Sequence, residues 1–250
     1  MVSWLLLVAS FCALLVLTQW VTKHIQGIGL LVTGDGRIAL ILYFVLIFPG
    51  VFVHECSHAL AAWILRVRVR HLAFGIRRKA QGDRVALGSV DIGATDPIRA
   101  SLIGLAPLIA GTASILLISN LALGLRPLAD VGPQGFWQAL QKIHQAPDFA
   151  LWTYLVFAVG NAMFPSAADR RSWTGALIFA AFVGALAYFS GLLRAVATPL
   201  GPWLRLGANQ LTYAFVVTLA VDLVIAIAVF VAEQTLGLLG FGRLEYRRHS

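Results

Sequence analysis

A short polar motif, His54-Glu55-Cys56-Ser57-His58, lies inside a long apolar stretch of the chain. On a helix, residues four positions apart lie on the same face, so the two imidazole rings can reach one metal ion. Two histidines at this spacing, with a glutamate directly after the first, are typical of Zn²⁺ sites in which the glutamate is the base. The motif therefore predicts a helix with His54 and His58 as metal ligands and Glu55 as the catalytic residue.

The surroundings of this motif favour a site inside a membrane. Glu55 is the only charged residue between positions 38 and 65, a segment long enough to span a bilayer. An ionisable side chain at the bilayer centre costs about 2.5–3.5 kcal/mol on insertion scales and usually serves a function. We therefore expect a metal site within the membrane, rather than two histidines that merely pack among helices.

The composition agrees with a membrane location. Hydrophobic residues make up 59% of the 250 positions and charged residues 12%, whereas soluble domains carry about 25% charged residues. We expect an integral, multi-pass protein of a bacterial or archaeal cell membrane, surrounded by the lipid bilayer. The net charge of +8 can be explained by basic loops that set membrane topology, so no nucleic-acid partner is predicted.

The hydropathy pattern predicts an all-α polytopic membrane protein with about six transmembrane helices, at residues 2–20, 38–65, 98–123, 149–164, 173–193 and 211–231. A connector with Lys23 and His24 is expected between the first two helices. Pro49 is expected to kink the second helix, and residues 104–107 to interrupt the third. Each predicted helix is bounded by a polar or turn-rich segment.

Two of the segments between the helices carry further patterns. Residues 66–70 and 84–92 alternate with period two around a charged turn at 77–83, which predicts a small β-hairpin between the second and third helices. A short interfacial helix is expected within 126–147. The chain accordingly divides into a first helix with its connector (1–37), a core of three spans and the hairpin (38–171), and two further helices with a basic tail (172–250).

The distribution of Lys and Arg predicts the orientation. Eight lie between residues 66 and 99, two at 170–171 and three in the C-terminal tail, thirteen in all, against six on the other side. By the positive-inside rule, both termini, the hairpin and the 170–171 loop are expected on the cytoplasmic side.

A catalytic zinc ion needs a third protein ligand. Asp169 follows the fourth predicted helix at its cytoplasmic end, the same side of the bilayer as the motif, which makes it the favoured candidate. An ordinary loop carboxylate paired with Arg170 or Arg171 is the alternative interpretation. Asp222, in the outer half of the last predicted helix, is a second candidate, although its expected depth fits less well.

These residues resemble the site-2 protease family of intramembrane zinc metalloproteases. That family has H-E-x-x-H on the first of three core helices and N-x-x-P…L-D-G on the third. The first motif is matched in full. The second is matched by Asn161, Pro165 and Asp169, with the proline one residue further on and Ala168-Asp169-Arg170 in place of Leu-Asp-Gly. The resemblance covers about residues 38–171, and the predicted hairpin falls where the family has a membrane-associated β element.

The resemblance implies a zinc metalloendopeptidase that carries out regulated intramembrane proteolysis. Its substrate would be a transmembrane protein, Asp169 would be the third Zn²⁺ ligand, and Asn161 would help to hold the substrate. Glu55 would accept a proton from water and return it to the leaving amine.

Two other functional classes are alternatives to a protease. A catalytically silent, membrane-embedded protein that binds transmembrane partners has no need of a base, so the presence of Glu55 disfavours it. A metal transporter would require polar residues across the whole membrane. On the outer side of His54, the second predicted helix offers only Tyr43, which disfavours transport.

Overall fold

Long helices make up most of the chain in the computed structural model, which describes residues 4–78, 85–124, 146–166 and 168–239. In chain order the elements are α1 (Trp4–Thr33), α2 (Gly36–Ile64), β1 (Val69–Arg78), β2 (Val85–Ile92), α3 (Pro97–Leu117), the π-helical turn η1 (Ile118–Ala122), α5 (Phe149–Ala162), the 3₁₀ turn η3 (Asp169–Ser172), α6 (Trp173–Phe189) and α7 (Leu193–Leu238). The mostly helical character predicted from the sequence is confirmed.

Four of the described helices are long and apolar enough to cross a membrane: Trp4–Thr33, Gly36–Ile64, Pro97–Ala122 and Thr198–Leu238. Helix α5 has 14 residues and so measures about 21 Å, less than the roughly 30 Å of a hydrocarbon core. Helix α6, with 17 residues, is also short. The six predicted spans are therefore not confirmed as a set. The structure supports four candidate spans and two shorter apolar helices.

Two helices continue through segments that were predicted to be loops. Lys23 and His24 lie within α1, because that helix runs on to the turn at Gly34, whose φ of 69° is favourable for glycine. The Nδ1 atom of His24 lies 2.7 Å from Glu233 Oε2 of α7, so the histidine has a polar partner inside the bundle. The predicted loop at 194–210 is the first part of α7, a single helix of 46 residues.

The helix that carries the third predicted span is not interrupted where the sequence suggested. Helix α3 continues through Pro107, which is buried, because neighbouring helices can accommodate a proline in a membrane helix. Its start is well defined. Asp96 Oδ1 accepts hydrogen bonds from the backbone N–H groups of Ile98 (3.1 Å) and Arg99 (2.9 Å), and Pro97 occupies the first position of the helix.

The predicted hairpin is confirmed. β1 and β2 pair antiparallel from Val69 opposite Ile92 to Arg78 opposite Val85. The bounds of the first strand differ from the prediction, because residues 66–68 form the connection from α2 and β1 begins only at Val69. β1 also includes Arg77 and Arg78, which had been assigned to the turn. The rest of that turn, the predicted interfacial helix apart from residues 146–147, and the basic tail at 240–250 lie outside the described residues.

The chain leaves α2 for the hairpin through a tight C-terminal cap. The backbone N–H of Arg66 donates to Trp63 O (3.0 Å) and that of Val67 donates to Ala62 O (2.8 Å). Together with the left-handed φ of 57° at Arg66, this pair of bonds is the Schellman motif. Val67 and Ala62 are both buried and belong to one apolar cluster with Ile103 of α3. The cap fixes the direction in which the hairpin starts.

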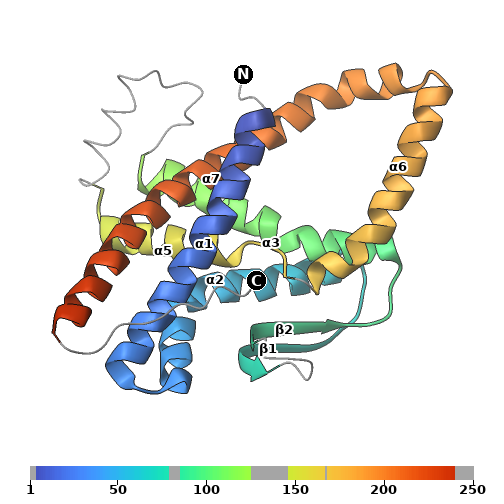
Figure 1. Ribbon diagram of the computed structural model, residues 1–250. Coiled ribbons are helices and arrows are strands. Elements are labelled where there is room, and N and C mark those ends of the chain that lie inside the picture. Colours follow the sequence, from blue (N-terminus) through green and yellow to red (C-terminus); the bar gives the residue numbers. More distant parts are fainter. Residues whose placement is uncertain (1–3, 79–84, 125–145, 167, 240–250) are drawn as a thin grey trace, which may run out of the picture.

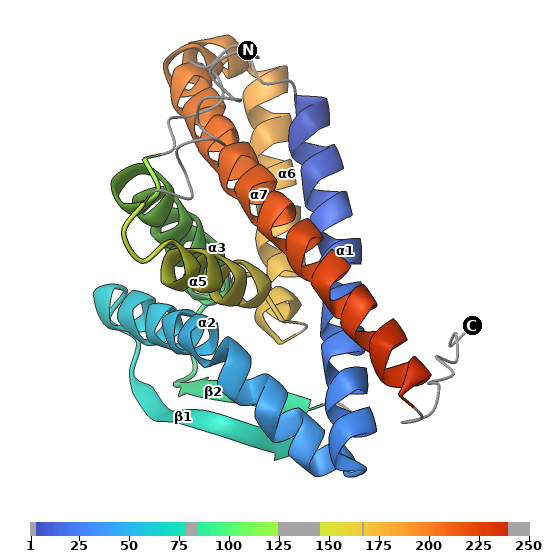
Figure 2. The ribbon, with the colours of Figure 1, turned by 90° about the vertical axis from the view of Figure 1, so that its left-hand side faces the viewer.

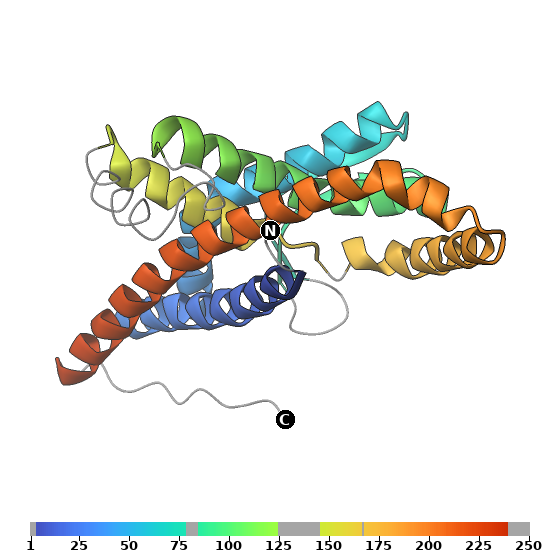
Figure 3. The ribbon, with the colours of Figure 1, turned by 90° about the horizontal axis from the view of Figure 1, so that it is seen from above.

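Helix α2 occupies the centre of the fold. It contacts α1, α3, α5 and both strands, whereas α1 packs mainly along α7. Figures 1 and 2 show the hairpin alongside α2 and a change of direction about halfway along this helix, and Pro49 lies near the middle of its range. Figure 3 shows α6 standing apart from α1 and α2. The His-Glu motif in α2 is thus surrounded by α3, the end of α5 and the hairpin.

Candidate metal centre

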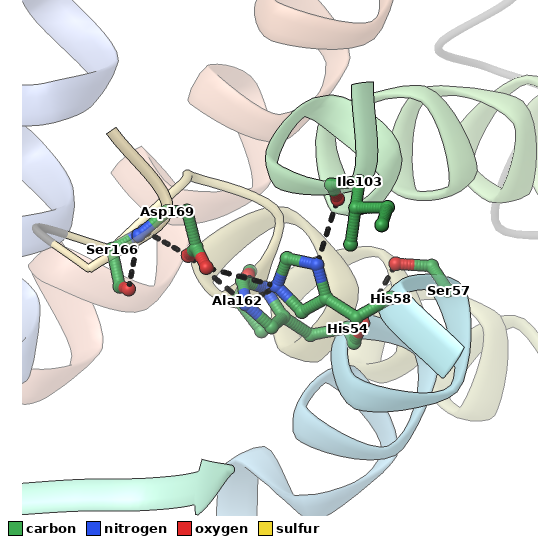
Figure 4. Close-up of polar contacts among 7 residues, drawn as sticks. All are labelled: His54, Ser57, His58, Ile103, Ala162, Ser166 and Asp169. Carbon is green, nitrogen blue, oxygen red and sulfur yellow. Dashed lines mark hydrogen bonds and ion pairs between the residues drawn. The ribbon is translucent and has the colours of Figure 1, made fainter. Parts of the chain in front are cut away.

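Three predicted ligands lie together in the structure. The side chains of His54 and His58 from α2 and Asp169 from η3 each offer a ligand atom, and these atoms all lie within 4.8 Å of one another. His58 Nε2 is 3.2 Å from Asp169 Oδ1, and His54 Nε2 is 3.7 Å from Asp169 Oδ2. Figure 4 shows both rings and the carboxylate directed toward one point. The group could hold a metal ion.

The orientation of both rings is set by backbone carbonyl groups. His54 Nδ1 donates a hydrogen bond to Ala162 O at the end of α5 (2.6 Å), and His58 Nδ1 donates to Ile103 O in α3 (2.8 Å). Because a carbonyl oxygen can only accept, each Nδ1 carries the hydrogen, and each Nε2 keeps its lone pair for a cation. Such hydrogen bonds are the usual support for metal-binding histidines.

The spacing of the ligand atoms fits a divalent cation. The two Nε2 atoms lie 3.2 Å apart, and two lone pairs at this distance repel unless a proton or a metal ion lies between them. For tetrahedral Zn²⁺ with Zn–N bonds of about 2.0–2.1 Å, two nitrogen ligands are expected about 3.3 Å apart. The carboxylate beside them adds the negative charge that a dication requires.

Asp169 is held in place by its own loop. Its Oδ2 accepts a hydrogen bond from the backbone N–H of Ser166 (2.6 Å), and its backbone N–H donates to Ser166 Oγ (3.4 Å). This reciprocal pair is the capping-box arrangement at the start of a helical turn. Burial alone would raise the pKa of the Asp169 carboxyl, but the hydrogen bonds that His54 and His58 donate to it when they are protonated, together with the one from Ser166, hold the pKa well below its usual range. The carboxylate is thus in the form that binds metal.

The Asp169 loop approaches α3 at a glycine. A Cβ atom on Gly104 would lie 2.6 Å from the carbonyl oxygen of Asp169 and 3.2 Å from Trp173 Nε1. Real Cβ atoms do not come this close to backbone oxygen. Only a residue without a side chain therefore lets the loop lie where its carboxylate reaches the histidines.

The metal ligands open onto a cavity of about 750 Å³ that also contains Glu55. Glu55 is only 7% exposed. Six consecutive residues of β2, from Leu87 to Ile92, line the cavity. Alternate residues of a strand point to opposite faces, so a run of six indicates that β2 presents its edge to the cavity. The predicted base and the predicted ligands therefore share one cavity.

Asn161 and Asp222 lie next to this centre but not in it. Asn161 lines the cavity, and its amide nitrogen donates to Phe157 O and to Asp222 Oδ1. Asp222 is fully buried in α7 and is not part of the metal-binding group among the described residues. The preference for Asp169 over Asp222 agrees with this arrangement, in which Asp222 contacts Asn161 near the end of α5.

Sequence reasoning missed three supporting groups. Ser166 could have been found, because Ser166 and Asp169 have the spacing of a capping box. The carbonyl groups of Ala162 and Ile103 leave no signal in the sequence, since every residue has one. Their role becomes visible only when α3 and α5 are placed against α2.

Comparisons of the chain with known protein families, with curated proteins and with solved structures each found no match.

Proposed function

We propose that the chain is an intramembrane zinc metalloprotease that hydrolyses a peptide bond within transmembrane segments of membrane proteins. One observation carries the proposal. Two histidines, each with Nδ1 bonded to a carbonyl oxygen, direct their Nε2 atoms toward Asp169, in a cavity that also contains Glu55. Three protein ligands with a further position left for water are characteristic of catalytic zinc sites.

Each residue of the centre has a distinct chemical role. Zn²⁺, when bound, supplies an electrophile for the scissile carbonyl group and acidifies a water molecule. Glu55 accepts the proton of that water and returns it to the leaving amine, as a general base and then a general acid. His54, His58 and Asp169 are the ligands. Glu55 is buried beside the ligands, so the proton transfer would take place next to the metal and with little exposure to solvent.

The cavity favours an extended, apolar peptide. Its lining includes Tyr43, Ile47 and Val51 of α2 and Leu87 of β2. Within the described part of the chain β2 pairs only with β1, in a sheet of two strands, so its second edge could receive a substrate strand. A peptide that leaves its helix loses internal hydrogen bonds, and pairing with β2 would replace them. We propose this as the way in which a transmembrane segment is held for cleavage.

The membrane setting agrees with this function. The four long apolar helices are those of a membrane protein, and the surplus of basic residues in and near the hairpin favours a cytoplasmic location for that end of the site and for both termini. The motif resemblance to site-2 proteases points to the same reaction class.

The proposal is tested by metal analysis combined with cleavage of a model transmembrane substrate by the purified protein. Glu55→Gln should retain zinc and lose hydrolysis, because it removes the base and no ligand. His54→Ala and His58→Ala should lose both. Cys56→Ser, a change within the same motif at a position that contributes no ligand, should retain both. Cleavage by Glu55→Gln at the wild-type rate would disprove the mechanism. Binding of the substrate without cleavage by the wild type would assign a binding role instead.

A further inference from the structure

A buried polar contact joins α5 to α7 beside the catalytic cavity. The side-chain nitrogen of Asn161 lies 2.8 Å from Asp222 Oδ1, and the hydroxyl of Thr18 in α1 donates to Asp222 Oδ2 at 3.5 Å. Asp222 has no exposed surface and lies in the apolar part of α7. An acidic residue at such a position is rare in membrane helices and usually has a function. The metal centre does not use it.

This contact determines which way the Asn161 amide faces. Besides Asp222 Oδ1, the amide nitrogen also donates to the carbonyl oxygen of Phe157 (2.9 Å). The carbonyl oxygen of Phe157 can only accept, and Asp222 Oδ1 accepts here, so both must face the NH₂ group and both of its hydrogens are used. The amide oxygen is consequently directed to the opposite side.

The amide oxygen of Asn161 is a hydrogen-bond acceptor without a partner. It is buried and accepts no hydrogen bond from any described residue, although Asn161 is one of the residues that line the catalytic cavity. Buried polar atoms are nearly always paired, so an unpaired one calls for an explanation. A ligand that brings a donor into the cavity would provide the missing partner. An extended peptide carries such a donor at every residue except proline.

We propose that Asp222 is a positioning residue that holds Asn161 with its amide oxygen toward the cavity, where that oxygen accepts a hydrogen bond from a backbone N–H of the bound peptide. The inference rests on the proposed function in taking a peptide as the ligand. The role of Asp222 depends on its acceptor oxygen and not on its charge. Asp222→Asn keeps an oxygen for Asn161 and turns its NH₂ toward Thr18, whose hydroxyl can accept. Asp222→Leu keeps the approximate size and removes the acceptor.

The orientation can be measured without any substrate. The chain has three asparagines, Asn120, Asn161 and Asn209, so selective ¹⁵N labelling gives three side-chain amide signals, and loss of one in Asn161→Ala assigns it. The Asn161 amide protons should exchange slowly with water in the wild type and in Asp222→Asn. In Asp222→Leu they should exchange at least tenfold faster. An unchanged exchange rate in Asp222→Leu would overturn the proposed contact.

Binding of a peptide then tests the function of this orientation. The probe is a fluorescent Leu/Ala transmembrane peptide with lysine ends and a central Asn-Gly pair, titrated in detergent micelles against protein that carries Glu55→Gln. Asp222→Leu should weaken binding about tenfold, the equivalent of one hydrogen bond, and Asp222→Asn should bind as tightly as the parent. Asn161→Ala should weaken binding equally, and combining it with Asp222→Leu should add no further loss.

A matched control lies one turn away in the same helix. Thr218 is fully buried, and its hydroxyl donates only to Ala214 O of its own helix in the described structure. Thr218→Val should therefore leave both amide exchange and peptide binding unchanged. Equal affinity of Asp222→Leu and the parent would overturn the positioning role, as would an Asp222→Asn variant as weak as Asp222→Leu. If the wild type binds the probe and does not cut it, the protease proposal fails while the inference about Asp222 is still decided by these affinities.

Discussion

Gly88 of β2 lies directly against the carboxyl group of Glu55 in α2. A Cβ atom on Gly88 would lie within 2.8 Å of three side-chain atoms of Glu55. The hairpin is therefore a wall of the cavity at the position of the proposed base, and the strand can approach this closely only because residue 88 has no side chain.

Substitution of Gly88 should impair catalysis without removing the metal. In Gly88→Ala the added methyl group must displace either the strand or the Glu55 carboxylate, and misplacing a reacting group by about 1 Å costs on the order of 100-fold in rate. Zinc content should not change, because none of the ligands lies on β2. The matched control is Gly93→Ala, directly after β2, where the nearest atom to an added Cβ is Arg68 O at an ordinary 3.5 Å. Cleavage rates and zinc content of both variants check this prediction.

Removal of the carboxylate in η3 should weaken metal binding. Asp169→Ala is expected to lower zinc affinity by more than the roughly 10–100-fold typical for losing a group that only supports a ligand. Asp222→Leu should leave zinc affinity unchanged, since Asp222 is bonded to Asn161 and Thr18 and not to the histidines. Competition with a chelator of known affinity measures both. The reverse result would transfer the ligand role to α7.

A methyl group at residue 104 should weaken metal binding indirectly, by displacing the loop that carries Asp169. Gly104→Ala pushes against the carbonyl oxygen of Asp169 and so moves the loop that carries the carboxylate. We expect a fall of about tenfold or more in zinc affinity with little change in folding. Gly175→Ala is the control, because its added Cβ would meet only Pro97 Cβ at 3.5 Å. Equal zinc affinity of the two variants would contradict this prediction, because it would show that the Asp169 loop can shift without weakening metal binding.

The cap at the end of α2 predicts a stabilising substitution. Arg66 is exposed and has a left-handed backbone with φ of 57°, which costs residues other than glycine about 1–2 kcal/mol. Glycine avoids this cost but loses more backbone entropy on folding than arginine does. Arg66→Gly should therefore raise the free energy of unfolding in detergent by about 1 kcal/mol. Arg66→Val should lower it, because branched side chains are least tolerated there. Thermal unfolding followed by circular dichroism checks both directions.

The parts of the site that depend on local spacing could be predicted. His54, Glu55 and His58 lie in one helix, so their common face follows from the helical period alone. A hairpin in this region followed from the alternation in residues 66–70 and 84–92, although β1 begins only at Val69. The closeness of Asp169 to the histidines was an argument from topology, and it agrees with the structure even though α5 is shorter than a membrane span.

The number and lengths of the helices could not be predicted equally well. Apolar composition shows which segments avoid water, but not where a helix ends. Polar residues such as His24 were assigned to loops because the sequence does not reveal the partner, Glu233 of α7, that receives them inside the bundle. The same limit applies to Asp222. Its depth was judged from its position along one helix, whereas its contact with Asn161 depends on how α7 crosses α5.

The carbonyl groups that hold the two histidine rings have a consequence for mutational tolerance. Both acceptors, Ala162 O and Ile103 O, belong to the main chain. A substitution at position 103 or 162 therefore leaves the acceptor in place, provided that the helix keeps its course. Two proteins could differ at both positions and still fix their histidines in the same tautomer. This part of the centre depends on the path of the backbone and not on which residues stand at these positions. An alignment of residue identities would therefore not detect it.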